Sequence, residues 1–165
     1  MTLQPGVDHL GLRPAGPSDE PFLLDLYRHQ HGLALAALPL PQQQILLPLQ
    51  FRARQQSYTQ TYPASTDRLV LLDDAPIGRL WTADLPREHR IVDLALLPHH
   101  CGAGIGTCLL TSEIRRAAQA GKPLRLSVHR TNERARQLYA RLGFLLVEDD
   151  PVHLTFEVRT GTVST

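Results

Sequence analysis

Apolar and polar positions follow two different periods along the chain, and together they predict a mixed α/β fold. Apolar side chains recur every three or four residues in segments 20–32, 42–61, 105–121 and 132–142, which are therefore expected to be helices. Short apolar runs bounded by turn residues predict strands at 9–13, 68–72, 77–81, 91–97, 124–128, 144–147 and 152–158. This order of elements indicates an α+β arrangement with a largely antiparallel sheet. Pro48 is expected to kink the second helix or to delay its start.

The chain is short enough to form one domain. It has 165 residues and a mass of 18.4 kDa, and it contains no internal repeat or low-complexity linker. Two proline-rich joints, at 14–21 and 39–48, do not separate two plausible cores. We therefore expect a single domain at 9–165, preceded by a short N-terminal extension at 1–8.

The net charge limits the classes of binding partner that we expect, and the cysteine content indicates the cellular compartment. The 17 basic side chains nearly cancel the 16 acidic ones, so we expect neither a nucleic acid nor a membrane as partner. Cys101 and Cys108 are the two cysteines, too few for the disulfide framework of a small secreted domain. The sequence has no apolar run long enough to span a bilayer and no signal-peptide core near Met1. A cytoplasmic location is therefore expected.

A glycine-rich loop between a predicted strand and a predicted helix is the strongest candidate for chemistry. Gly102, Gly104 and Gly106 occupy alternate positions, so main-chain N–H groups could approach a ligand without interference from Cβ atoms. The following helix adds partial positive charge, which favours a phosphate or pyrophosphate. No lysine follows Gly106, which excludes the nucleotide-hydrolase loop, and Thr107 replaces the third glycine of the dinucleotide fingerprint. A turn that only lets helix and strand pack closely is the alternative.

Two separated segments together resemble the GNAT superfamily of N-acetyltransferases. The first is the strand and loop 94–107, which is similar to the acetyl-CoA motif Q/R-x-x-G-x-G/A of that family. The second, 132–144, has the pattern Asn-x-x-Ala-x-x-Leu-Tyr-x-x-Leu-Gly-Phe and is similar to the helix that follows in the family. One position departs from the family, because Cys101 stands where an arginine or glutamine usually opens the glycine signature.

The resemblance implies the GNAT fold, with a mostly antiparallel central sheet, a splayed parallel pair formed by 91–97 and 124–128, and about four flanking helices. It also implies that acetyl-CoA is the co-substrate, with its pantetheine arm in the gap between the splayed strands. In this fold the N–H of Leu96 or Leu97 would face the thioester carbonyl, and Tyr139 would protonate the departing thiolate. The positions that match the cofactor site are Leu96, Leu97, Gly102, Ala103, Gly104, Ile105, Gly106, Thr107, Asn132, Ala135 and Tyr139.

Several of these residues also have a purely structural interpretation. Tyr139 could be a core residue of an amphipathic helix, and Asn132 could serve as the N-cap of that helix. Asp93 is the only carboxylate inside the strand that leads to the glycine loop, so it must be paired or functional. We consider it the candidate general base, although strand alternation could turn it away from the acceptor. A structural ion pair with an arginine is the alternative.

The candidates for contact with the acceptor lie on the second predicted helix. Spacings of four, three and four residues place four side chains on one helix face. In the family that the chain resembles, the first two helices commonly border the acceptor site. The four residues are Phe51, Gln55, Tyr58 and Tyr62.

The sequence thus predicts an N-acetyltransferase in which a primary amine of a small molecule or peptide attacks acetyl-CoA directly, without a covalent enzyme intermediate. The alternative function is a non-catalytic acyl-CoA-binding regulatory module, which cofactor binding without turnover on any amine would favour. No metal is expected, because His99, His100 and Cys101 are adjacent and cannot easily direct three ligand atoms to one ion. A homodimer is left open.

Overall fold

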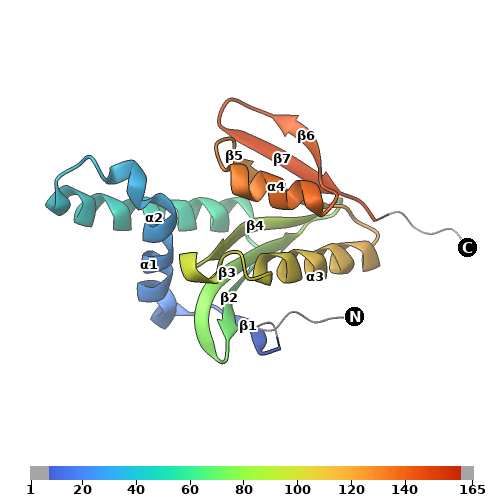
Figure 1. The fold of residues 1–165 in the computed structure, drawn as a ribbon, viewed down its shortest axis with the longest axis horizontal. Coiled ribbons are helices and arrows are strands. Elements are labelled where there is room, and N and C mark those ends of the chain that lie inside the picture. Colours follow the sequence, from blue (N-terminus) through green and yellow to red (C-terminus); the bar gives the residue numbers. More distant parts are fainter. Residues whose placement is uncertain (1–7, 161–165) are drawn as a thin grey trace, which may run out of the picture.

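The computed structural model describes residues 8–160, in which seven strands form one sheet (Figure 1). The strands are β1 (Leu10–Pro14), β2 (Thr66–Leu72), β3 (Ala75–Asp84), β4 (His89–Leu96), β5 (Leu124–His129), β6 (Leu145–Asp149) and β7 (His153–Val158). The α-helices are α1 (Glu20–His31), α2 (Leu40–Thr61), α3 (Ile105–Gln119) and α4 (Glu133–Arg141). The predicted mixed α/β order is confirmed, with boundaries shifted by a few residues. The predicted extension at 1–8 lies outside the described residues except for Asp8.

The sheet is mixed, with the strand order β1-β2-β3-β4-β5-β7-β6. Neighbouring strands are antiparallel except for β4 and β5, which are parallel. These two strands pair only at three positions, and the last of them joins Ile91 to Leu126. Beyond it β4 stays with β3 and β5 stays with β7, so β4 and β5 separate. The splayed parallel pair is therefore confirmed.

Two hydrophobic clusters cover the two faces of this sheet. α3 and α4 lie over the larger cluster, on the near side of the sheet in Figure 1. α1 and α2 lie over the opposite face, where Leu23 and Phe51 pack against Leu69 of β2. Successive strand residues point to opposite faces, so Leu69 and Val70 belong to different clusters. Any side chain of the sheet can therefore be assigned to the α1/α2 face or to the α3/α4 face.

α2 is one continuous helix of 22 residues despite its internal proline. It begins at Leu40, slightly before the predicted position, and it continues through Pro48, so the expected delay is wrong. Proline removes the hydrogen bond to the carbonyl four residues earlier, here that of Gln44. Gln44 is exposed, so water can satisfy the freed carbonyl. The part of α2 after Pro48 contributes Phe51 and its helical neighbours to the α1/α2 face.

A bulge in β4 changes the direction in which its side chains point. Trp81 of β3 pairs with Asp93, whereas the next residue, Thr82, pairs with Ile91. Val92 is therefore an extra residue in β4, and the alternation of faces is interrupted there. Ile91 belongs to the cluster under α3 and α4. Asp93, only two residues later, shares the α1/α2 face with Trp81.

A buried polar network fixes β4 to α3 just before the bulge. The Nε2 atom of His89 lies 2.6 Å from Oε2 of Glu113, and Arg68 Nη2 donates to Oε1 of the same carboxylate at 3.2 Å. His89 and Glu113 are both buried. The His89 N–H donates to the Pro123 carbonyl ahead of β5 at 2.9 Å. These bonds hold β4 and β5 together next to the point at which they separate.

Candidate active site

The glycine loop connects the end of β4 to the first turn of α3. Gly102 and Gly104 each have a φ of 82°, in the left-handed region where a side chain would be strained. Gly104 is the N-cap of α3, and no side-chain hydrogen bond caps the first turn, whose N–H groups point toward the loop. Gly106 already lies inside α3 without a positive φ, so backbone conformation requires only two of the three glycines. Ile105 is buried in the core and presents only its main chain to the loop.

The N–H groups at the end of β4 differ in their availability. The Leu97 N–H donates to the Ile77 carbonyl of β3 at 2.8 Å, so it is already engaged. Successive N–H groups of a strand point to opposite edges, so the Leu96 N–H points away from β3 and toward β5. The pairing with β5 ends at Ile91, which leaves the Leu96 N–H in the gap. Of the two predicted donors, only Leu96 points into the gap.

The loop gains a positive charge from α4 rather than from its own residues. Cys101 turns back toward the strand, with its Sγ 3.7 Å from the Leu96 carbonyl oxygen and 3.6 Å from that of Leu97. An Nη2 atom of Arg134 lies 2.9 Å from the point where a Cβ on Gly102 would stand. Arg134 is exposed, and among residues 8–160 it forms no ion pair within 4.0 Å. Its guanidinium therefore lies beside the loop with its charge uncompensated.

α4 carries the second predicted cofactor segment. Asn132 Oδ1 accepts a hydrogen bond from the Ala135 N–H at 3.2 Å, which confirms the capping role of Asn132. The Tyr139 ring is buried and packs against Phe144 and Phe156, with centroid distances of 5.5 and 5.9 Å. Burial, helped by the charge of Asp93, raises the pKa of the Tyr139 hydroxyl to about 12. The phenol is therefore protonated at neutral pH and lies within electrostatic reach of the candidate base.

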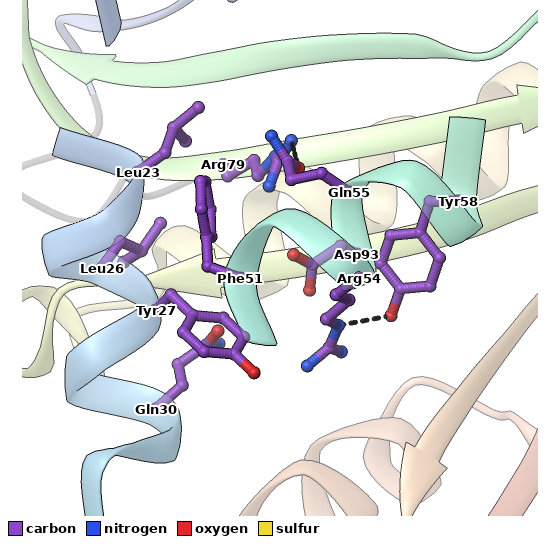
Figure 2. A pocket seen from close by; sticks show the side chains of 10 residues that line it. All are labelled: Leu23, Leu26, Tyr27, Gln30, Phe51, Arg54, Gln55, Tyr58, Arg79 and Asp93. Carbon is purple, nitrogen blue, oxygen red and sulfur yellow. Dashed lines mark hydrogen bonds between the residues drawn. The ribbon is translucent and has the colours of Figure 1, made fainter. Parts of the chain in front are cut away.

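A pocket between α1, α2 and the sheet contains most of the predicted acceptor contacts (Figure 2). Its hollow contains about 280 Å³ of space free of atoms, open solvent included, of which about 10 Å³ is accessible to the centre of a water molecule. Phe51, Gln55, Tyr58 and Asp93 all line it. Tyr62 does not, because α2 ends at Thr61 and the Tyr62 backbone leaves the helical conformation at φ −128° and ψ 70°. The remaining lining residues are Leu23, Leu26, Tyr27, Gln30, Arg54 and Arg79.

Asp93 enters this pocket because the bulge at Val92 turns it toward α1 and α2. Among the described residues no ion-pair partner lies within 4.0 Å of its carboxylate, so the alternative of a structural ion pair is not observed. Burial raises the pKa of Asp93, and the guanidinium groups of Arg54 and Arg79 offset the effect only in part. A carboxylate with a raised pKa holds a proton more readily than an ordinary one, as a general base must.

Arg79 is a buried cation that is paired with Asp67 at the base of the pocket. Its Nε and Nη2 atoms donate to the two carboxylate oxygens of Asp67 at 2.8 and 2.6 Å. It also donates to Oε1 of Gln55, and its guanidinium lies 4.4 Å from the ring centroid of Trp81. Asp67 thus neutralises the charge of Arg79, and the Nη1 group makes no hydrogen bond within residues 8–160.

Arg54 is half-buried and is held only by neutral groups. Its Nε donates to the Tyr58 hydroxyl at 2.8 Å, as Figure 2 shows, and its Nη1 lies 2.7 Å from Nε2 of His31. Burial, together with the charge of Arg54, lowers the pKa of His31 to about 4, so its imidazole is neutral and Nε2 accepts. Burial opposes the charge of Arg54, yet Asp93 and Tyr58 hold the pKa of Arg54 above its usual value. Among residues 8–160, no carboxylate lies within 4.0 Å of its nitrogens.

Sequence reasoning missed the basic and polar part of this pocket. Arg54 lies three residues after Phe51 and four before Tyr58, so the helical spacing that selected the two aromatic residues also includes it. An arginine between aromatic residues on one helix face was the signal that could have revealed it. Tyr27 and Gln30 gave no comparable signal, because they lie on α1, whose apolar positions resemble those of any surface helix.

Neither a metal centre nor a membrane segment is found in the part of the chain that the structure describes. The His99 and His100 rings are tilted by 46° with centroids 4.3 Å apart, while Cys101 points to main-chain carbonyls. Residues 8–160 contain no group of three or more His, Cys, Asp or Glu residues arranged to hold a metal ion. No helix in the same residues is sufficiently long and apolar to cross a membrane.

The splayed strands, the glycine loop and α4 agree with a comparison against known protein families. A model of the acetyltransferase (GNAT) family matches residues 25–144. The chain belongs to the GNAT acetyltransferase family. Acetyl transfer from a coenzyme A thioester is therefore the activity expected at the family level. None of the curated protein sequences compared with this GNAT protein is significantly similar to it.

Solved structures confirm the fold of this acetyltransferase. The PaiA N-acetyltransferase of Thermoplasma acidophilum, in complex with coenzyme A, is 18% identical with a TM-score of 0.70, covering 92% of this chain and 99% of that chain. An acetyltransferase from Thermus thermophilus is 23% identical with a TM-score of 0.68, covering 93% and 98%. A Salmonella typhimurium acetyltransferase that modifies the N-terminal serine of a 50S ribosomal subunit protein is 17% identical with a TM-score of 0.64, covering 96% and 99%. At these identities the likeness shows the fold alone.

The residues present fit acetyl-CoA, which the family implies. Gly102 and Gly104 form a cradle that a side chain would strain or fill, beside the uncompensated charge of Arg134. Such a cradle suits an anionic pyrophosphate. β5 no longer pairs with β4 at Leu96, so the Leu96 N–H needs another partner in the gap. The pantetheine arm of acetyl-CoA could supply that partner. The donor set is therefore compatible with a coenzyme A thioester.

Proposed function

We propose that this protein is an N-acetyltransferase that transfers an acetyl group from acetyl-CoA directly to a primary amine of a small molecule or peptide. One observation supports the proposal above all: the Asp93 carboxylate lines a pocket, without an ion-pair partner among the described residues, on the strand that also presents the Leu96 N–H to the gap. A base and a hydrogen-bond donor on one strand are what attack on a thioester carbonyl requires.

Cofactor binding is assigned to the glycine loop and the start of α4. Main-chain N–H groups of 102–107 would hold the pyrophosphate, and the Arg134 guanidinium would add the charge that Cys101 cannot. Asn132 and Ala135 begin α4 beside this loop, and Leu96 and Leu97 border the gap. Because Gly102 has no Cβ, the Arg134 guanidinium can lie against the loop backbone.

Acetyl-CoA, when bound, supplies an activated acetyl thioester, and the chain supplies position and proton transfer. Asp93 accepts the proton that the amine nitrogen loses as it bonds to the acetyl carbon, directly or through a water molecule. The Leu96 N–H donates to the carbonyl oxygen, on which negative charge grows during the attack. The Tyr139 hydroxyl gives its proton to the sulfur as the carbon–sulfur bond breaks. Solvent then returns a proton to Tyr139 and removes one from Asp93, which balances the cycle.

Three further features of the protein belong to the same proposal. One domain at 9–165 would carry the whole activity, in line with the single sheet. A cytoplasmic location is supported by two free thiols, Cys101 and Cys108. A homodimer is supported by the edge strand β6, where Leu145, Leu146 and Val147 are exposed.

Calorimetry combined with a thiol-release assay tests this function. Acetyl-CoA and CoA should bind at micromolar to millimolar concentration, and adding an acceptor amine should release free CoA. Gly104→Glu should abolish binding, because it fills the cradle and adds a negative charge beside the pyrophosphate. If neither ligand binds at millimolar concentration, the glycine loop is only a turn that lets helix and strand pack closely. Binding without thiol release on any amine would instead favour a non-catalytic acyl-CoA-binding module.

A further inference from the structure

Two opposite charges line the acceptor pocket without neutralising each other. Asp93 lies on β4 and Arg54 lies on α2, and both border the same empty space (Figure 2). No nitrogen of Arg54 lies within 4.0 Å of a carboxylate oxygen of Asp93, because the structure contains no ion pair between them. The charge of Asp93 nevertheless influences Arg54, so the two groups are near neighbours.

The other titratable side chains near the two charges carry no unpaired charge. Arg79 is neutralised by both oxygens of Asp67, and His31 is neutral. Asp93 and Arg54 are therefore the two charges that remain available to a ligand among the lining residues. A half-buried charge that lacks a partner carries a desolvation cost, which a ligand of opposite charge would relieve.

The geometry of Arg54 favours a planar anion. Its Nε–H and one Nη1–H are used by Tyr58 and His31, which fix the orientation of the guanidinium. Three of its five N–H groups remain, and they include both on Nη2. A guanidinium presented in this way binds a carboxylate through two hydrogen bonds, whereas a lone ammonium would offer no such match.

We infer that the acceptor is a free amino acid, or a small amino carboxylate of similar size, whose carboxylate binds Arg54 while its amine lies at Asp93. The inference rests on the proposed acetyl transfer and specifies its substrate class. Peptide N-termini lack the α-carboxylate and are disfavoured by the same argument. Phe51, Leu23 and Leu26 supply an apolar wall, so the side chain of the amino acid is expected to be apolar or aromatic.

The experiment compares three acceptors that differ only in the carboxyl group. Acetyl transfer from acetyl-CoA is measured with amino acids such as phenylalanine, methionine and leucine, with their carboxamides, and with the corresponding amines that lack the carboxyl group. For the best amino acid, kcat/KM should exceed that of its carboxamide and its decarboxylated amine by about 10- to 100-fold, as expected for a charge-assisted bidentate contact. Equal rates on all three would overturn the inference while leaving acetyl transfer intact. No transfer to any amine would overturn the proposed function itself.

Variants of Arg54 separate recognition from a general effect on the base. Arg54→Gln should lower kcat/KM for the amino acid by about 10- to 100-fold more than for the decarboxylated amine, which feels only the lost charge beside Asp93. Arg54→Lys should lie in between because it keeps the charge and loses the fork. Arg52→Gln is the matched control, because Arg52 is exposed on the same helix and pairs with Glu20 outside the pocket. An equal loss on all three acceptors would show that Arg54 acts only by positioning Asp93, and it would overturn the inference.

A binding measurement covers the case in which an Arg54 variant is inactive for another reason. Trp81 is the single tryptophan, and its ring lies 5.4 Å from that of Tyr58 at the pocket. With CoA present, its fluorescence should change on titration with the amino acid and change far less with the decarboxylated amine. The difference should disappear in Arg54→Gln and persist in Arg52→Gln. Equal responses to the two ligands in the unaltered protein would contradict the assignment of Arg54.

Discussion

Asp93 lies opposite Trp81 across the β3–β4 pair, on the face that α1 and α2 cover, although Ile91 belongs to the other face. The extra residue Val92 causes this reversal. In a regular strand the Asp93 carboxylate would point toward α3, where Glu113 is already buried. One inserted residue thus supplies the pocket between α1, α2 and the sheet with a carboxylate that has a raised pKa.

Replacing Asp93 by asparagine is expected to separate catalysis from cofactor binding. The amide cannot accept a proton from the amine, so turnover should fall by about 100- to 10,000-fold, the usual contribution of general base catalysis. The affinity for acetyl-CoA should stay within a few fold, because Asp93 lies away from the glycine loop. Steady-state kinetics and calorimetry on the same preparation measure both. Unchanged turnover, with chemistry limiting the rate, would remove Asp93 from the mechanism.

The same variant should be more stable than the unaltered protein at neutral pH. Burial raises the pKa of Asp93, so the folded protein binds this proton more tightly than the unfolded chain does. The ionised carboxylate therefore destabilises the folded state above its folded pKa, and Asp93→Asn removes that cost. The advantage should shrink as the pH falls through the folded pKa and vanish below the unfolded value of about 3.9. Urea unfolding at several pH values measures it, and an advantage that grows toward acid would contradict the assignment.

Replacing Tyr139 by phenylalanine tests the proton donor. The ring contacts with Phe144 and Phe156 remain, so folding should be nearly unaffected. Loss of the hydroxyl should lower turnover by about 100-fold or more while the affinity for CoA is nearly kept. The effect should be smaller with a synthetic acetyl thioester whose thiol is a better leaving group. Full activity of Tyr139→Phe would contradict the role of Tyr139 as proton donor and would indicate a purely structural role in the core.

Arg134 is expected to replace the basic side chain that is missing at Cys101. Arg134→Gln should weaken CoA binding by about 10-fold, and increasing salt should weaken the unaltered protein more than the variant. Arg141→Gln, at the other end of α4, serves as the control. Adding Cys101→Arg to Arg134→Gln should restore affinity, whereas Cys101→Ala alone should leave it within a few fold. Calorimetry with CoA compares the four variants with the unaltered protein, and full affinity in Arg134→Gln would contradict this role.

Gly78 tests the close approach of β3 to the proposed oxyanion donor. A Cβ at Gly78 would lie 2.3 Å from the Ala95 carbonyl oxygen and 2.7 Å from Leu96 Cδ2. Gly78→Ala should therefore destabilise the protein by about 1–3 kcal/mol or more and weaken acetyl-CoA binding by displacing Leu96. Gly11→Ala is the control, because the nearest atom to its new Cβ, Leu71 Cβ, is 3.9 Å away. Equal melting temperatures of the two variants would contradict the predicted clash.

The order of elements and the glycine loop were predictable from local signals. Helical spacing, turn residues and the alternate glycines are properties of short segments, and Asn132 is recognisable as a cap from its place before α4. The direction of Asp93 was not predictable, because the bulge at Val92 depends on the register between β3 and β4. The placement of Tyr62 on the same helix face was wrong, because the spacing rule assumes a helix that actually ends at Thr61.

Contacts between distant segments explain the remaining differences. The choice between Leu96 and Leu97 depends on which N–H bonds to Ile77, a fact of strand pairing rather than of composition. Arg134 and Gly102 lie far apart in the sequence and meet only in the folded protein. The importance of Arg54 emerges when its neutral partners, Tyr58 and His31, are seen together with Asp93.

A single-turnover experiment with radiolabelled acetyl-CoA tests the central claim most directly. The protein, in excess over the label, is mixed with the best acceptor of the amino acid and amine panel, quenched at intervals and analysed for free CoA, acetylated amine and acetylated protein. Direct transfer predicts that free CoA and acetylated amine appear together in equal amounts, without label on the protein, and that both are lost in Asp93→Asn although acetyl-CoA still binds. Label that accumulates first on Cys101, or bound acetyl-CoA that never acetylates an amine, would contradict the account.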